Sequence, residues 1–357
     1  MKGFGHFEES NNKTDSKNLQ NSNSNQLIKY ALHYHSQGNI LEATKYYKLF
    51  LENGFSNPIV FSNYGVICKQ NGQINLAKKL FRKSIEMYPD RLEPYLNLSN
   101  ILQDEESFYQ AELLTRKVID LQPDNALAFL NLSGILRSLG KSKETEEALR
   151  KAIQLEPTNA SFYVSLGAFL LGIGRFKDAE IETIKAINID SRCDKALYNL
   201  GIILRNLGKF KEAEDVLRRA INFQPDFAIA YRELGIVLAK DNKLSEAETS
   251  IRKAIKIDPF CEKIFFNLGG VLRDLGKTED AEKAFRKAIH AEPDYIDSYT
   301  FLASTLQELN KINESESFYL KAIELQPFNE ELHMNRYHFL LKCKKFEEAW
   351  KENEWRW

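Results

Sequence analysis

The stretch ALYNLGIILRNLGKFKEAEDVLRRAINFQPDF, residues 196–227, decides the fold because its pattern recurs along most of the chain. Its apolar and small residues are spaced three and four apart, which places them on one face of a helix. A glycine-lysine pair divides the stretch into two such segments, and a proline ends the second one. The stretch therefore predicts two helices joined by a short turn.

A fixed period runs through the chain and is marked by proline. The prolines are Pro89, Pro123, Pro157, Pro225, Pro259, Pro293 and Pro327, with Ser191 in the one missing slot. The step from Pro89 to Pro123 is kept throughout, and a fixed period of this size predicts a repeat architecture. With proline counted as position 32, nine full windows cover residues 24–329, and a partial tenth window covers residues 330–357. Residues 1–23 are rich in Asn, Ser and Lys, which predicts a disordered tail.

The same side-chain sizes return at the same positions of each window. Position 4 is mostly aromatic, position 7 is mostly leucine, position 8 is small, and positions 20 and 27 are mostly alanine. Glycine is frequent at position 15, where it supplies the left-handed backbone that closes a helix. The aspartates after the prolines are expected to cap the next helix, and they are Asp90, Asp124, Asp226 and Asp294.

Residues 196–227, and likewise IFFNLGGVLRDLGKTEDAEKAFRKAIHAEPDY at 264–295, resemble the tetratricopeptide repeat (TPR). The resemblance extends over nearly the whole chain after residue 24. It implies an all-α fold, an α-solenoid in which antiparallel helix pairs stack into a right-handed superhelix. It also implies a concave groove lined by the first helix of each pair. Window 1 departs most from the pattern, as terminal repeats usually do, with Phe55 in the proline slot.

The stretch from Gly134 to Ser142 looks like the end of a phosphate-binding loop. A P-loop requires a strand, then GxxxxGK[ST], then a helix. Five residues separate Gly134 from Gly140, which is one too many, and the same turn recurs as Gly208-Lys209-Phe210 without a hydroxyl. We therefore expect no nucleotide site. The lysine is interpreted as a residue near a helix C-terminus that complements the helix dipole.

Composition excludes several classes of function. The chain has 49 basic and 50 acidic residues, so broad electrostatic binding to nucleic acid or to a membrane is not expected. It has no apolar run long enough to cross a membrane and no signal-peptide pattern near its start, which favours a cytoplasmic protein. The six histidines form no ligand motif. No CxxC pair occurs among the four cysteines, which are Cys68, Cys193, Cys261 and Cys343. We expect no metal, no cofactor and no enzymatic activity.

Two positions of the first helix carry the candidate binding residues. Position 6 holds Asn63, Asn97, Asn131, Asn199 and Asn267, and also Asn335 in the partial window. Asparagine is unfavourable within a helix. Either these residues bridge to an adjacent repeat, or their amides bind the main chain of an extended peptide. Position 12 adds Arg137, Arg205 and Arg273, which either pair with acidic ligand groups or form a solvated wall. Ser165, Glu233 and Phe301 interrupt the asparagine series.

Two functions follow from this pattern. The first is a non-catalytic protein-interaction scaffold that binds an extended peptide or a partner helix in its groove. The second comes from a resemblance, because the asparagine ladder is similar to that of the O-linked N-acetylglucosamine transferases, where it implies a lumen that holds polypeptide. In that reading the chain is the N-terminal, substrate-recruiting arm of a protein O-glycosyltransferase, without its catalytic domain.

All three tryptophans fall in the last residues of the chain, and they are Trp350, Trp355 and Trp357. A solenoid normally ends in a polar face that covers its last apolar surface. Either the last helix folds back and the tryptophans form its core, or another domain or subunit docks at this C-terminal end.

Overall fold

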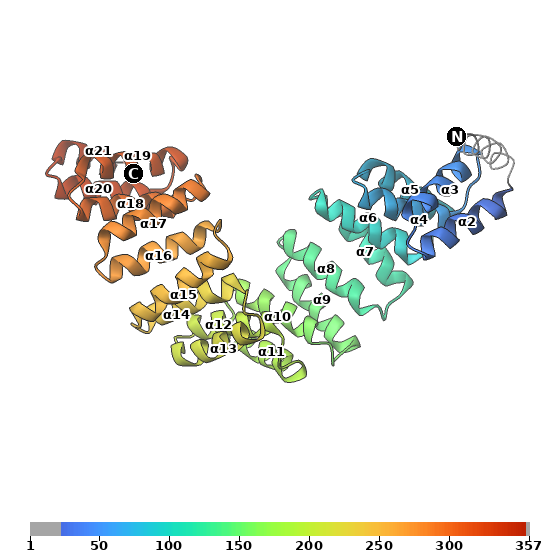
Figure 1. Cartoon of the computed structure of the whole chain (residues 1–357), viewed down its shortest axis with the longest axis horizontal. Coiled ribbons are helices and arrows are strands. Elements are labelled where there is room, and N and C mark those ends of the chain that lie inside the picture. Colours follow the sequence, from blue (N-terminus) through green and yellow to red (C-terminus); the bar gives the residue numbers. More distant parts are fainter. Residues whose placement is uncertain (1–22, 355–357) are drawn as a thin grey trace, which may run out of the picture. The chain divides into compact units, whose positions relative to one another are not determined.

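The structure, a computed structural model, describes residues 23–354, and all regular structure in that range is helical (Figure 1). Between these residues it has twenty helices and no strand, which confirms the all-α prediction. The tail predicted for residues 1–23 lies outside the described residues except for Asn23, and so do residues 355–357. The chain divides into two compact units, residues 1–157 and residues 158–357.

Each unit is a series of helix pairs in which every helix packs against the next along the chain. The described helices of unit 1 are α2 (Ser24–Ser36), α3 (Ile40–Glu52), α4 (Pro58–Gln70), α5 (Ile74–Met87), α6 (Leu92–Asp104), α7 (Phe108–Leu121), α8 (Ala126–Ser138) and α9 (Ser142–Leu155). Those of unit 2 are α10 (Ala160–Gly172), α11 (Phe176–Ile189), α12 (Asp194–Asn206), α13 (Phe210–Phe223), α14 (Ala228–Lys240), α15 (Leu244–Ile257), α16 (Glu262–Asp274), α17 (Thr278–Ala291), α18 (Ile296–Glu308), α19 (Ile312–Leu325), α20 (Glu330–Lys342) and α21 (Phe346–Glu354).

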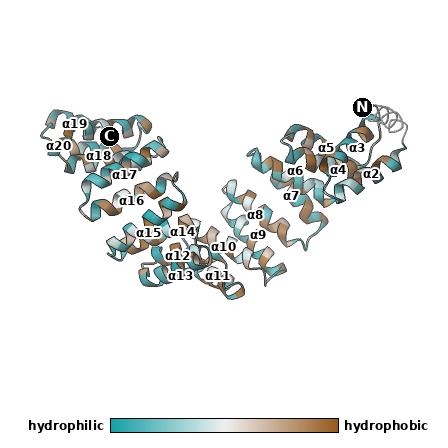
Figure 2. Ribbon diagram, in the orientation of Figure 1, coloured by the Kyte–Doolittle hydropathy of each residue, from teal (hydrophilic) through white to brown (hydrophobic). Residues whose placement is uncertain are grey.

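Small residues at position 8 let the two helices of a pair come close together. A Cβ atom built on Gly201 of α12 would lie 2.5 Å from Cγ of Leu217 in α13. The same relation holds in the pair α16–α17, where a Cβ atom on Gly269 would lie 2.5 Å from the ring of Phe285. Figure 2 shows hydrophobic and hydrophilic residues interleaved along the helices of both units, as amphipathic helices require.

The turn within each pair has the predicted left-handed backbone. Gly208 adopts φ +75° between α12 and α13, and the glycines at the same position of other repeats are similar. Glu106 and Lys344 occupy this position in two repeats and keep φ values of 58° and 59°. The stacked pairs therefore impose the turn even where glycine is absent.

The aspartate caps are a wrong prediction. The N-cap of each affected helix is the residue after the aspartate, and Asn125 shows this because its side chain accepts a hydrogen bond from the backbone N–H of Ala128 at 3.0 Å. Asn159 and Asn329 cap α10 and α20 in the same way. The aspartates lie one residue too early, inside the connecting turn.

The lysine of the glycine-lysine pair also has a role that the sequence did not predict. Lys141 follows the C-terminal end of α8 and is at the same time the N-cap residue of α9, so the expected role at a helix dipole stays a prediction. Its Nζ atom lies 2.8 Å from Glu112, on the second helix of the preceding repeat. The same ion pair recurs between repeats in unit 2, as Lys209–Glu180, Lys243–Glu214, Lys277–Glu248, Lys311–Glu282 and Lys345–Glu316. This ladder of ion pairs connects neighbouring repeats.

Candidate peptide-binding face

The first helices of unit 2 lie against each other in the order α10, α12, α14, α16 and α18. We call the side that they form the first-helix face. Asn199 and Arg205 come from α12, and Asn267 and Arg273 come from α16. The other candidates belong to first helices of unit 1, with Asn63 on α4, Asn97 on α6, and Asn131 and Arg137 on α8.

The predicted asparagines do not all behave alike. The amide of Asn63 donates a hydrogen bond to the hydroxyl of Tyr47, on the preceding repeat, at 3.3 Å. The amide of Asn97 donates to the carbonyl of Glu93, in its own helix, at 2.9 Å. Three asparagines are half-buried, and their amides form no hydrogen bond with any described residue; they are Asn131, Asn199 and Asn267. These three have both a donor and an acceptor available.

Two of the three predicted arginines already have partners within unit 2. Nε of Arg205 donates to Oε1 of Glu233 at 2.5 Å, and Glu233 is only 3% exposed. The guanidinium carbon of Arg273 lies 5.1 Å from the ring centre of Phe301. Arg137 is exposed in unit 1, and no described residue forms an ion pair with it.

Sequence reasoning treated Glu233 and Phe301 only as interruptions of the asparagine series, whereas they are the partners of the arginines. Each lies on the first helix of the repeat that follows its arginine. Ser165 stands at the same position in the repeat after Arg137. From Asn131 to Asn267, asparagine and arginine thus occur together in every second repeat. The sequence did carry a signal of this alternation, because the arginines and the asparagines of these repeats recur with the same spacing of two repeats.

Other groups near the arginines make this part of the first-helix face both aromatic and basic. Burial raises the pKa of Tyr198 although Arg232 lies beside its hydroxyl. Nε of Arg232 is itself buried and has no hydrogen-bond partner among the described residues. The rings of Phe266 and Phe301 meet edge to face, with centroids 5.0 Å apart. A polypeptide on this face would contact rings and guanidinium groups around each available amide.

The C-terminal candidates are described in part. Trp350 of α21 is 59% exposed, whereas its neighbour Ala349 is buried against α20 and α19. α21 is attached to α20 by Glu352, which contacts His333 at 2.7 Å and also Arg336. Trp350 therefore does not form the core of this helix pair. Trp355 and Trp357 lie outside the described residues, and docking at this end stays a prediction.

Between residues 23 and 354, no group of histidine, cysteine, aspartate or glutamate side chains could hold a metal ion. No helix in that range has both the length and the apolar character needed to cross a membrane. The four cysteines are free.

Two sequence models of the tetratricopeptide repeat match the chain, and together they cover more than half of it. The matched segments are residues 60–91, 126–159, 194–227, 228–261, 262–295 and 296–329. The chain belongs to the tetratricopeptide repeat family. The TPR repeats indicate a protein-interaction scaffold. No curated protein matches the chain by sequence.

Two solved structures share the fold at low sequence identity, and a third is similar to about half of this chain. Yeast Tom70 is 16% identical, with 93% of this chain and 91% of that chain covered and a TM-score of 0.53. PilF of Pseudomonas aeruginosa is 19% identical, with 60% and 97% covered and a TM-score of 0.51. YrrB, described as a TPR protein with an unusual peptide-binding site, is 23% identical, with 52% and 95% covered and a TM-score of 0.42.

Proposed function

We propose that the chain is a non-catalytic scaffold that holds an extended polypeptide along its first helices. The observation that carries this proposal is the unused hydrogen-bonding capacity of the Asn199 and Asn267 amides. Both are half-buried on the first-helix face of unit 2, and neither amide is used by a described residue. An amide with a free donor and a free acceptor matches the N–H and C=O groups of one peptide unit. Asn131 provides the same group in unit 1.

The spacing of the two asparagines suits a β-like ligand. They are two repeats apart, and stacked helices lie about 8–10 Å apart, so the amides are separated by roughly 16–20 Å. An extended chain advances about 3.3 Å per residue, so five or six residues span that distance. Six residues would bring both contacts to the same side of the extended chain, because its sides alternate with a period of two.

The arginines limit which ligands bind easily. A ligand carboxylate that approaches Arg205 must compete with Glu233, which already accepts a hydrogen bond from it. Arg137 has no such competitor among the described residues. Unit 2 would therefore prefer a ligand with neutral or aromatic groups near its arginines, whereas Arg137 of unit 1 could accept an acidic ligand group. The recruiting-arm alternative rests on its family resemblance alone and stays a prediction.

The test compares two sets of asparagine variants in the full chain. A polypeptide captured by the wild-type chain would be titrated against Asn199→Ala/Asn267→Ala and against Asn97→Ala. Each amide contributes about 0.5–1.5 kcal/mol, so the double variant should bind about 5- to 150-fold more weakly. Asn97→Ala is the matched control because its amide is used within its own helix. If the double variant stays folded and binds at full strength, the asparagines are not the binding site.

A further inference from the structure

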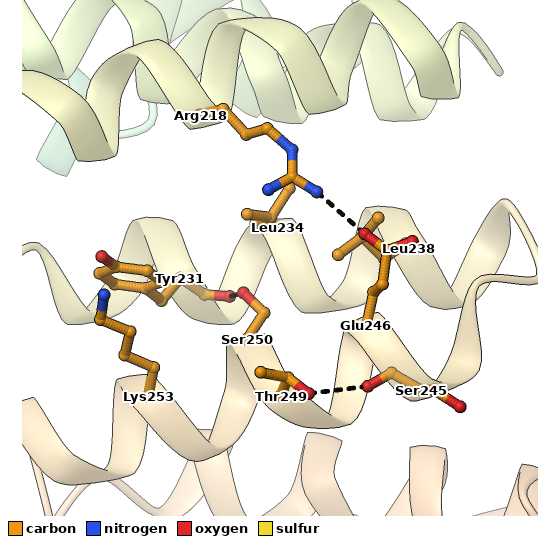
Figure 3. Close-up of a pocket in the computed structure, with 9 residues that line it drawn as sticks. All are labelled: Arg218, Tyr231, Leu234, Leu238, Ser245, Glu246, Thr249, Ser250 and Lys253. Atoms are coloured by element: carbon orange, nitrogen blue, oxygen red, sulfur yellow. Dashed lines mark hydrogen bonds and ion pairs between the residues drawn. The ribbon is translucent and has the colours of Figure 1, made fainter.

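A cavity opens on the second-helix side of unit 2, between α13 and α15, and Figure 3 shows the residues around it. Its volume is about 360 Å³, and an adjoining cavity of about 410 Å³ shares several of its residues. The floor consists of Tyr231, Leu234 and Leu238 from α14, and the walls carry Arg218, Ser250 and Lys253. We call this space the α13–α15 cavity. The cavity opens between two second helices, whereas the proposed peptide-binding face is formed by first helices.

The corresponding place two repeats further along is filled by the chain itself. Phe318 of α19 lies there, and its ring centroid is 6.1 Å from that of Tyr299. The guanidinium carbon of Arg286 lies 5.4 Å from the centre of the Phe318 ring. The Phe318 ring is thus held between a tyrosine on the floor and an arginine on the wall. This position allows an aromatic contact with the tyrosine and a cation–π contact with the arginine.

Ser250 takes the place of Phe318 in the α13–α15 cavity. It stands two repeats before Phe318, just as Tyr231 and Arg218 stand two repeats before Tyr299 and Arg286. The Ser250 hydroxyl donates to the carbonyl of Tyr231 at 2.8 Å, so it turns towards the backbone and leaves the space open. The cavity therefore has the floor and the wall of an aromatic site, but its ring must come from elsewhere.

The charge at the cavity favours an acidic group next to that ring. Nζ of Lys253 lies 4.8 Å from the centre of the Tyr231 ring and forms no ion pair with any described residue. Arg218 is already engaged, because it contacts both Glu214 and Glu246. Lys253 is thus the cation available to a ligand carboxylate.

This chain offers a segment with the required chemistry. Phe260, in the turn after α15, is 85% exposed. Asp258 precedes it by two positions, and its carboxylate accepts a hydrogen bond from the backbone N–H of Phe260 at 3.2 Å. Four other repeats have aspartate in place of this phenylalanine. An exposed aromatic side chain with a carboxylate held next to it complements an apolar cavity with an available lysine.

We propose that the α13–α15 cavity receives Phe260 of a second copy of this chain. The ring enters between Tyr231 and Arg218, and Asp258 of the incoming copy approaches Lys253. Because α15 lines the cavity and also leads into Phe260, each copy can give a ring and receive one in a two-fold contact.

The contact is a weak one. Two buried rings account for about 300–500 Å². A standard stable interface buries about 1,200–2,000 Å² in total. We expect a dimer dissociation constant of about 10–100 µM, which corresponds to a transient complex.

Analytical ultracentrifugation of the full chain, from roughly 1 to 500 µM, tests the proposal. Ser250→Phe fills the cavity as Phe318 does two repeats on, and Phe260→Ala removes the ring; each should raise the dimer dissociation constant at least about 10-fold. Phe328→Ala is the matched control because Phe328 occupies the same place in a later turn and is 88% exposed. It should dimerise like the wild type.

Three outcomes would overturn the proposal: a wild-type chain that stays monomeric throughout, a dimer that survives Ser250→Phe or Phe260→Ala, or an equal loss in Phe328→Ala. Circular dichroism checks that each variant is folded. Should Ser250→Phe fail to fold, Lys253→Glu replaces it. That variant places like charges together and should weaken the dimer at least about 10-fold. An unchanged dimer in Lys253→Glu would also contradict the proposal.

Discussion

Glu233 of α14 accepts a hydrogen bond from Nε of Arg205 in α12 at 2.5 Å, at a position where most repeats carry asparagine. The carboxylate is 3% exposed, and the arginine side chain is 25% exposed. The pair connects two neighbouring first helices across the proposed binding face. The pair therefore mainly stabilises the packing of two neighbouring repeats, and its effect on ligand binding is secondary.

Glu233→Ala should lower the free energy of unfolding by about 1–3 kcal/mol, because it leaves a partly buried arginine without its acceptor. A double-mutant cycle with Arg205→Ala, followed by denaturant unfolding, should give a coupling energy of about 1–2 kcal/mol. The exposed pair Arg218–Glu246 is the control, with about 0–1 kcal/mol expected. Equal coupling in the two pairs would show that burial of Glu233 adds nothing.

The ion-pair ladder should make stability depend on pH in the acidic range. The hydrogen bond from Lys243 lowers the pKa of Glu214, and that from Lys277 lowers the pKa of Glu248. A lowered pKa stabilises the fold fully above the unfolded value, near 4.5, and this contribution is lost as the pH falls through the folded value. The melting temperature should therefore fall between about pH 5 and pH 3.

The variant Lys243→Met/Lys277→Met should melt lower than the wild type at pH 7 and should lose less as the pH falls. Lys211→Met is the control, because Lys211 is exposed on α13 and no described residue forms an ion pair with it. If the melting temperatures of the wild type and the double variant fell by the same amount from pH 7 to pH 3, the ladder would not be the cause of the pH dependence.

Two glycine-to-alanine changes should have opposite effects. In Gly201→Ala the new methyl group would lie 2.5 Å from Leu217, so this variant should lose about 1–3 kcal/mol of unfolding free energy. In Gly270→Ala the methyl group meets nothing within 4 Å, so helix propensity should stabilise the chain by about 0.5–1 kcal/mol. Chemical denaturation of both variants measures the difference. Destabilisation of equal size in both would contradict the packing explanation.

Lys141 should matter for stability and not for nucleotide binding. Its ammonium group is held by Glu112, so Lys141→Ala should lower the melting temperature of the chain. ATP or GTP at millimolar concentration should leave the wild-type melting temperature unchanged, whereas a ligand at 100 times its dissociation constant would stabilise by about 2.7 kcal/mol. A nucleotide-dependent rise that disappears in Lys141→Ala would show that the glycine-lysine turn binds phosphate.

The fold could be predicted from the sequence because the residue pattern within one helix pair is repeated in the next pair along the chain. Leucine, small residues and glycine recur with the period of the helix pairs, and the structure has those pairs and the left-handed turns. It was less informative about side chains that act between repeats. Glu233 and Phe301 appeared as irregularities because their partners stand in the preceding repeat, and comparison within one window does not reveal such a relation.

The capping error has a similar origin. Aspartate is a good N-cap, but whether Asp124 or Asn125 occupies the cap depends on where the turn ends, which composition does not specify. The open cavity above Tyr231 could not be predicted from the sequence either, because it depends on the difference between Ser250 and Phe318, which stands two repeats away.

The alternation of the first helices sets a rule for how this chain could lengthen or shorten. Excision of one repeat, such as residues 228–261, would leave Asn267 in the place that Glu233 had held relative to Arg205. The backbone period would be intact, but the arginine would face an amide in place of a carboxylate. Excision or duplication of an arginine-bearing repeat together with the repeat that follows it, such as residues 194–261, would keep every remaining arginine next to its own partner. The unit that recombination could copy without penalty is therefore a double repeat, although the fold alone would accept single ones.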